Sequence, residues 1–224
     1  MKLLHQETNI LLILEEGIPN ILVLENKEQF YNLIYELVLQ IQGSDGNWFF
    51  SISNRDATIS KNLDIILDFF NLSYNHRTNL TKLYNNLKSI SNDGEYYAEF
   101  LEIKQLIADY FLKISNNIHL PLDFDTEFDI TNIFKMMDVK FSESEYTLVE
   151  KILIYMDIAF ELLGIKLFSF VNLLTFLPDE SLELFYRDIA YKKYSVLLFE
   201  NKWDRIKIGE EKIKIYDTDF CEIC

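Results

Sequence analysis

Four acidic residues alternate along one short stretch, and their side chains are the ones in this sequence best suited to binding a metal ion. Asp123, Asp125, Glu127 and Asp129 occupy every second position of the segment LPLDFDTEFDI. In an extended backbone all four would project to one side. Carboxylates crowded in this way repel one another unless a cation lies among them. Hard oxygen ligands in a flexible loop suit calcium, so the four residues are candidate calcium ligands.

A solvated acidic connector between two parts of the chain would show the same pattern. The segment lacks the glycine and the terminal glutamate that an EF-hand loop requires. The spacing therefore leaves both interpretations open.

Basic side chains that could contact phosphate groups precede or lie within the first helical stretch in the middle of the chain. The net charge of the 224 residues is −15, and a uniformly acidic surface repels DNA, RNA and anionic membranes. Nucleic-acid binding would therefore need basic residues focused on one face. An ordinary solvated surface is the alternative. The candidate DNA-binding residues are Arg55, Lys61, Arg77, Lys82 and Lys88.

Motifs for nucleotide binding and for nucleophilic catalysis are missing from the sequence. There is no GxxxxGK[ST] phosphate loop, no GxGxxG and no GxSxG. None of the three histidines, His5, His76 and His119, has neighbours in the sequence that suggest a catalytic triad, so we interpret each as a surface or hydrogen-bonded residue. We expect a protein that is not an enzyme and binds no nucleotide.

The only cysteines, Cys221 and Cys224, provide at most half of a zinc site and no disulfide framework. We interpret the pair as an incidental tail. The sequence shows no convincing signal peptide and no apolar run long enough to span a membrane. These features predict a soluble, cytoplasmic protein.

Hydrophobic patterns place strands at both ends of the chain and helices in the middle. The N-terminal part shows an apolar strand, a helix and a second strand, which predicts a β-α-β unit of a mostly parallel sheet. The C-terminal part predicts two buried strands around a helix opened by Pro178, and then a hairpin. The ranges are 20–24, 28–42 and 48–52, followed by 167–173, 178–191, 196–199 and 205–216.

The middle of the chain has helical spacing over most of its length. Residues 62–70 fit either a short helix or a strand, whereas four later stretches are amphipathic helices. We therefore expect an α/β head from residues 1–60 and 165–224, with a helical subdomain inserted at 61–164 and an acidic connector at 121–130. The four helical ranges are 79–90, 96–114, 129–137 and 144–163.

Three segments in this order resemble the small accessory adaptation protein of type II-A CRISPR systems, over nearly the whole chain. They are NILVLENKEQFYNLI, DITNIFKMMDVKF and LFSFVNLLTFLPDESLELFYRDIAYKKYSVLLFEN. The last segment carries most of the resemblance, with a strand, Asn172, a Leu-Pro helix start and the VLLFEN strand.

The resemblance implies an α/β head related to nucleotide-binding ATPase cores, without a working phosphate loop, and an inserted helical subdomain. It also implies a non-catalytic homotetrameric ring that binds calcium and holds linear double-stranded DNA in its hole during spacer acquisition. The implied partners are DNA ends, the CRISPR integrase complex and the RNA-guided nuclease. Asp123, Asp125, Glu127 and Asp129 lie where the family places calcium ligands.

Two other functions stay open at this point. One is a protein-only scaffold of the adaptation complex, whose acidity selects its partners. The other is a phosphohydrolase or nuclease that uses the carboxylates near Asp125, which the missing phosphate-loop lysine argues against. If the chain holds DNA, the binding should be independent of sequence and strongly sensitive to salt, because only phosphate contacts are available.

Overall fold

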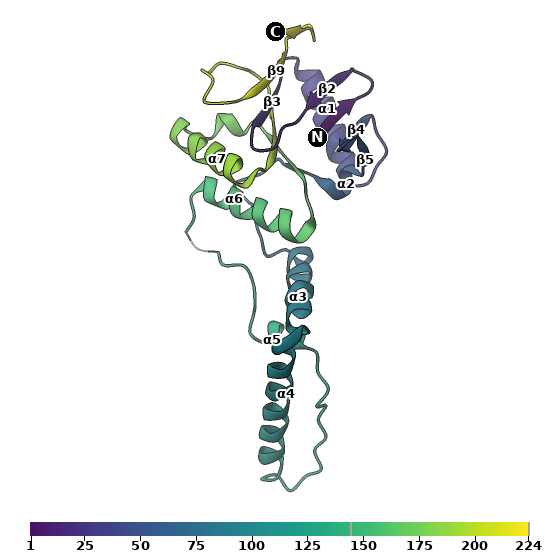
Figure 1. Cartoon of the computed structure of the whole chain (residues 1–224), viewed down its shortest axis with the longest axis vertical. Coiled ribbons are helices and arrows are strands. Elements are labelled where there is room, and N and C mark those ends of the chain that lie inside the picture. Colours follow the sequence, from purple (N-terminus) through teal and green to yellow (C-terminus); the bar gives the residue numbers. More distant parts are fainter. Residues whose placement is uncertain (144, 224) are drawn as a thin grey trace. The chain divides into compact units, whose positions relative to one another are not determined.

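A computed structural model describes residues 1–143 and 145–223 of the chain (Figure 1). It contains two compact units. The first joins Met1–Ser73 to the described residues from Glu145 to Ile223, and the second is Tyr74–Glu143.

The first unit is built on a six-stranded sheet in the order β10-β9-β3-β8-β7-β6. Only β10 is antiparallel to its neighbour, and the other pairs are parallel. This confirms an α/β fold with a mostly parallel sheet drawn from both ends of the chain. The bounds are β3 Pro19–Leu24, β6 Leu63–Ile66, β7 Leu167–Val171, β8 Ser195–Glu200, β9 Lys212–Tyr216 and β10 Glu222–Ile223.

A second, four-stranded sheet of order β2-β1-β4-β5 is antiparallel throughout. Its inward face is apolar and buried, as Leu3, Ile10 and Phe50 show. The bounds are β1 Lys2–His5, β2 Ile10–Ile13, β4 Trp48–Ile52 and β5 Arg55–Ala57.

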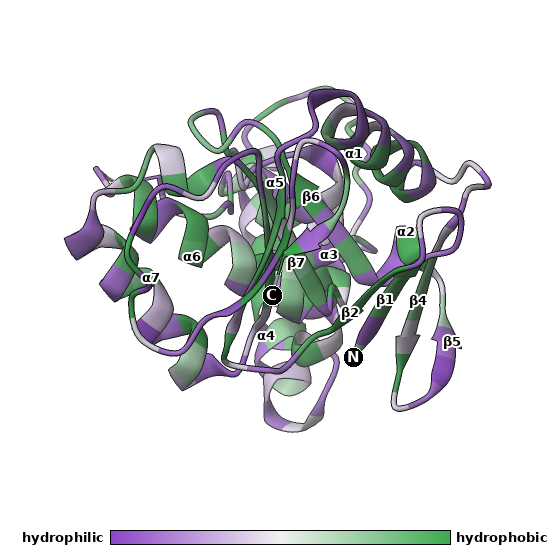
Figure 2. Cartoon of the chain, turned by 90° about the horizontal axis from the view of Figure 1, so that it is seen from above, coloured by the Kyte–Doolittle hydropathy of each residue, from purple (hydrophilic) through white to green (hydrophobic). Residues whose placement is uncertain are grey.

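Helices cover both faces of the large sheet, with α6 and α7 on one side and α1 on the other (Figure 2). Along β3, Ile21 and Val23 belong to the core under α6 and α7, while Leu22 and Leu24 belong to the core under α1. A parallel strand buried on both faces is apolar on both of its sides, which explains the four consecutive apolar residues Ile21 to Leu24 of β3. The bounds are α1 Lys27–Ile41, α2 Ile59–Asn62, α6 Leu148–Ile158, the π-helical turn η1 Ala159–Leu163, the 3-10 turn η2 Leu173–Thr175 and α7 Asp179–Lys192.

Local capping fixes where several of these helices begin. The Asn26 side chain accepts hydrogen bonds from the N–H groups of Glu28 and Gln29, both at 3.1 Å, at the start of α1. Thr147 and Glu150 form a reciprocal capping box at the start of α6.

The second unit is helical, with α3 at Arg77–Ser91, α4 at Gly94–Ser115 and α5 at Ile130–Met136. The segment between α4 and α5 is extended and returns along α4, where Phe124 lies 5.9 Å from Phe111 and Phe128 lies 6.1 Å from Phe100 (ring centroids). None of the described helices is long and apolar enough to cross a bilayer.

Two strand predictions were wrong in their pairing. Trp48–Ile52 is a strand, but it pairs antiparallel with β1 in the small sheet and does not complete a β-α-β unit. The 205–216 stretch is not a hairpin, because only Lys212–Tyr216 is a strand and it pairs parallel with β3. In both cases the local pattern identified a strand, whereas its partner depends on residues distant in the sequence.

The helical unit is shorter than the expected 61–164. β6 pairs with β7 in the large sheet, and α6 packs with α7 in the core of the first unit. The residues before Tyr74 and after Glu143 therefore belong to the head.

Candidate nucleic-acid interface

α3 combines three basic residues with no acidic residue, in a chain whose net charge is −15. Its start is held by Asn79, which is buried and donates a hydrogen bond to the backbone oxygen of Tyr74 at 2.9 Å. Arg77 and Lys82 are exposed and form no ion pair with any other described residue. Threonine, serine and asparagine make up much of the remaining surface of α3, and their side chains also bind phosphate oxygens.

Lys88, the third basic residue of α3, is already paired. Its ammonium forms a short ion pair with the carboxylate of Asp129. This contact brings together one predicted DNA-binding residue and one predicted calcium ligand. In this conformation both charges are satisfied within the second unit.

The other two predicted DNA-binding residues belong to the first unit. Arg55 opens the short edge strand β5, and Lys61 lies in α2. Both are exposed, and neither forms an ion pair within the described residues. They are available to a phosphate, but they belong to a different unit from the basic helix α3.

The acidic stretch is extended, as its alternation predicts, and its phenylalanines explain the pattern. Phe124 and Phe128 turn toward α4, whereas Asp123, Asp125 and Glu127 are exposed. An extended chain with one apolar edge on a helix must send the alternate side chains outward.

Two of the four carboxylates are engaged by lysines. Glu127 lies 2.8 Å from the ammonium of Lys104, and Asp129 pairs with Lys88. Asp129 also accepts the N–H of Thr131 at 2.9 Å as the N-cap of α5. The hydrogen bond from Lys88, with that from Thr131, lowers the pKa of Asp129 to about 2.

As they are placed here, these residues do not fit a calcium ion. Calcium takes six to eight oxygen ligands, but the described residues contain no group of three or more acidic, histidine or cysteine side chains that could hold a metal. The four carboxylates are spread along the segment, and the nearest cations to two of them are lysines.

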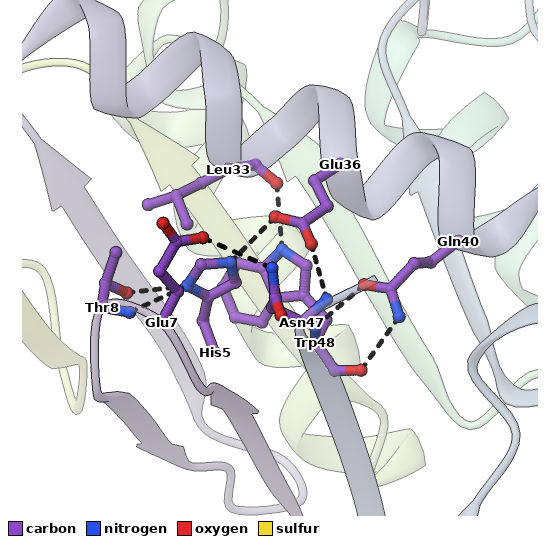
Figure 3. Close-up of polar contacts among 8 residues, drawn as sticks. All are labelled: His5, Glu7, Thr8, Leu33, Glu36, Gln40, Asn47 and Trp48. Carbon is purple, nitrogen blue, oxygen red and sulfur yellow. Dashed lines mark hydrogen bonds and ion pairs between the residues drawn. The ribbon is translucent and has the colours of Figure 1, made fainter. Parts of the chain in front are cut away.

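A polar network in the first unit joins the small sheet to α1 (Figure 3). The buried ring of His5 contacts Glu36 through Nε2 and Thr8 through Nδ1, both at 2.9 Å. Glu36 also accepts the N–H of Asn47 at 2.5 Å. Burial acts to raise the pKa of Glu36, but the hydrogen bonds from His5 and Asn47 outweigh it and hold the pKa below its ordinary value.

This network has a structural role that sequence reasoning missed. Both ring nitrogens of His5 are used, which agrees with its interpretation as a hydrogen-bonded residue. The available signal was a lone carboxylate, Glu36, between the apolar positions Leu33 and Leu37 of one helix. His76 and His119 are exposed, as is Cys221, and Cys224 lies outside the described residues.

Comparison with solved structures finds similarity to an ABC transporter ATP-binding protein from Pyrococcus furiosus. The identity is 9%, the TM-score is 0.40, and the alignment covers 92% of this chain and 88% of that one. No curated protein matches the sequence significantly.

The sequence profile of the family described as CRISPR-associated protein (Cas_Csn2) matches residues 40–220. The matched range includes β4 to β9 and the whole helical unit. Since this is well over half of the chain, the protein belongs to the CRISPR-associated protein (Cas_Csn2) family, an accessory family of CRISPR adaptation.

Proposed function

We propose that this protein binds linear double-stranded DNA without sequence preference and without catalysis, as a homotetrameric ring, during CRISPR spacer acquisition. The observation that carries the DNA-binding part is α3, with Arg77 and Lys82 exposed and unpaired among the described residues and no acidic side chain on the helix. A ring lets an acidic protein hold DNA, because a duplex confined in the hole needs only modest attraction.

Assembly is supported by apolar surface on α4. Leu106 is 68% exposed and Tyr110 is 62% exposed, and further large apolar side chains of the same helix are open to solvent. Exposed apolar area of this extent marks interaction sites in soluble proteins. The helix is therefore suited to contact another copy of the chain.

The first experiment is a gel shift at low salt with linear and covalently closed duplexes of equal length. We expect the linear duplex alone to bind, since a closed ring cannot be threaded onto a closed circle. Binding should weaken steeply with salt because phosphate contacts release counterions. No shift with either duplex would leave the protein-only scaffold as the better function, and phosphate release from DNA or nucleotide would show an enzyme.

The double variant Arg77→Ala/Lys82→Ala tests α3 directly. Each phosphate contact contributes about 0.9 to the slope of log K against log salt, so losing both should lower that slope by roughly 2 for every copy of the chain whose α3 contacts the duplex. Lys113→Ala, an exposed lysine of α4, is the matched control. If the slope of the double variant equals that of the wild type, α3 does not contact DNA.

A calcium requirement remains a prediction from the family resemblance, and no step of the proposed binding depends on it. Repeating the gel shift with calcium and with chelator tests it. Asp123→Asn/Asp125→Asn removes the two carboxylates that no described lysine pairs. Calcium dependence that survives this change would place the ligands elsewhere.

The integrase complex and the RNA-guided nuclease are the proposed protein partners, and pull-down with each tests them.

A further inference from the structure

The small antiparallel sheet has a second face, opposite to the one that is buried in the core under α1. Its inward residues, such as Leu3 and Phe50, are buried in that core, so the alternate residues of each strand point to the opposite face. On this outer face Ile13 is 59% exposed, Phe49 52% and Leu11 43%. The solvated face of an antiparallel sheet is normally polar, so exposed apolar side chains here indicate a contact surface.

The strand register joins these side chains into one patch. The partly exposed Leu4 of β1 lies directly opposite Leu11 of β2 on one side and Phe49 of β4 on the other. Ile13 follows two residues after Leu11, on the same face of β2. Directly opposed residues of antiparallel strands have Cβ atoms about 5 Å apart, so large side chains there form one surface. The outer patch, made of Leu4, Leu11, Ile13 and Phe49, therefore extends without a break across three strands.

The charges on the outer face are balanced. In the row beside the patch, Lys2 lies opposite Ser51, and Ser51 lies opposite Asp56. Lys2 and Asp56 are exposed, and neither forms an ion pair with another residue that the structure describes, although Lys2 donates a hydrogen bond to Asn54 at 3.1 Å. This face is therefore neutral, whereas the net charge of the chain is −15. Two copies of so acidic a chain repel one another least where they meet through a neutral face.

The outer face is also complementary to itself. In a two-fold contact the same surface of both copies is used. With the two-fold axis between β1 and β4, the strand order β2-β1-β4-β5 of one copy faces β5-β4-β1-β2 of the other. Leu4 of one copy then faces Phe49 of the other. Lys2 lies one strand spacing, about 5 Å, to the side of the Asp56 of the other copy, which a lysine side chain can span.

We propose that the outer face of the small sheet is a second self-contact of this protein, a two-fold interface with another copy of the chain. This contact rests on the proposed homotetramer. A two-fold contact through α4 joins copies only in pairs, so a closed tetramer needs a second, different contact. The outer face provides it in the first unit, whereas α4 belongs to the second unit.

The test is sedimentation velocity of the full chain and its variants at matched concentration. Ile13→Asp/Phe49→Asp places two carboxylates in the outer patch and should convert tetramers into dimers that α4 still holds together. Adding Leu106→Asp should leave monomers. Ile206→Asp, at an apolar residue 89% exposed and outside the outer patch, should remain a tetramer.

A charge exchange distinguishes a lost contact from a folding defect. Lys2→Glu should raise the dimer–tetramer dissociation constant roughly tenfold, because like charges then meet across the interface. Lys2→Glu/Asp56→Lys should restore it. Both positions are exposed, and circular dichroism checks that each variant is folded. If the exchanged variant stays as weak as Lys2→Glu, the two residues do not meet across the interface.

The assembly states separate this contact from the ring itself. If Ile13→Asp/Phe49→Asp forms tetramers as the wild type does, the outer face is not an interface and the ring still stands. If the wild type forms only dimers and this variant is monomeric, the sheet contact is supported and the tetrameric ring is refuted. A wild type that stays monomeric at tens of micromolar refutes both.

Discussion

Asp129 shows how one carboxylate can serve two structural purposes at once. It caps α5 through the Thr131 N–H and it pairs with Lys88. Asp129→Asn keeps a capping side chain but loses the charge, so the free energy of unfolding should fall by about 0.5 kcal/mol, a small value because solvent screens this partly exposed pair. Asp129→Ala also loses the cap and should cost about 1 kcal/mol more. Urea denaturation measures both.

The pH dependence of this effect follows from the lowered pKa of Asp129. Its stabilising contribution is complete above the ordinary value of 3.8 and is lost as the pH falls toward about 2. Equal stability of the asparagine and alanine variants would show that the cap does not contribute.

Glu200 gives the opposite pH dependence. Burial raises the pKa of Glu200 from 4.5 to about 7, so the folded protein favours the protonated carboxyl group more than the unfolded chain does. The protein therefore loses stability as the pH rises from 4.5 through 7. Between pH 4.5 and 8 the free energy of unfolding should therefore fall by about 3 kcal/mol more in the wild type than in Glu200→Gln. Urea denaturation at both pH values checks this, with Glu180→Gln expected to follow the wild type. Parallel pH profiles for Glu200→Gln and the wild type would contradict it.

At the scale of elements, helices and buried strands were predictable because their signals are local. Pro178 and Asp179 do open a helix, the NILVL and VLLF runs are central strands, and the 48–52 strand has the predicted bounds. The short strands β1, β2 and β5 were missed, because four residues or fewer show too little periodicity. Which strands pair with one another, and which lysines pair with the acidic stretch, depends on contacts between residues far apart in the sequence. A local pattern of residues carries no information about such contacts.

The extended segment between α4 and α5 supplies a prediction about an element. Phe128 packs against Phe100 and anchors the segment to α4. Phe128→Ala should release it and increase proteolytic cleavage between residues 117 and 128, because local opening exposes the backbone. Leu122→Ala, at a residue 53% exposed, is the matched control. Unchanged cleavage in Phe128→Ala would mean that the Phe124 contact with Phe111 and the lysine pairs hold the segment without Phe128.

At the scale of the whole molecule, the proposed ring requires that the apolar side of α4 be covered by another copy. Leu106 is 68% exposed, and placing a charge there would leave an unpaired, desolvated carboxylate in the interface. Leu106→Asp should therefore reduce the tetramer to smaller species in sedimentation velocity at matched concentration. Ile206→Asp is the control, since Ile206 is 89% exposed in the head and its replacement should leave assembly unchanged. A wild-type chain that sediments as a monomer at tens of micromolar would refute the ring. If both variants remain tetrameric, the copies assemble through a surface other than this side of α4.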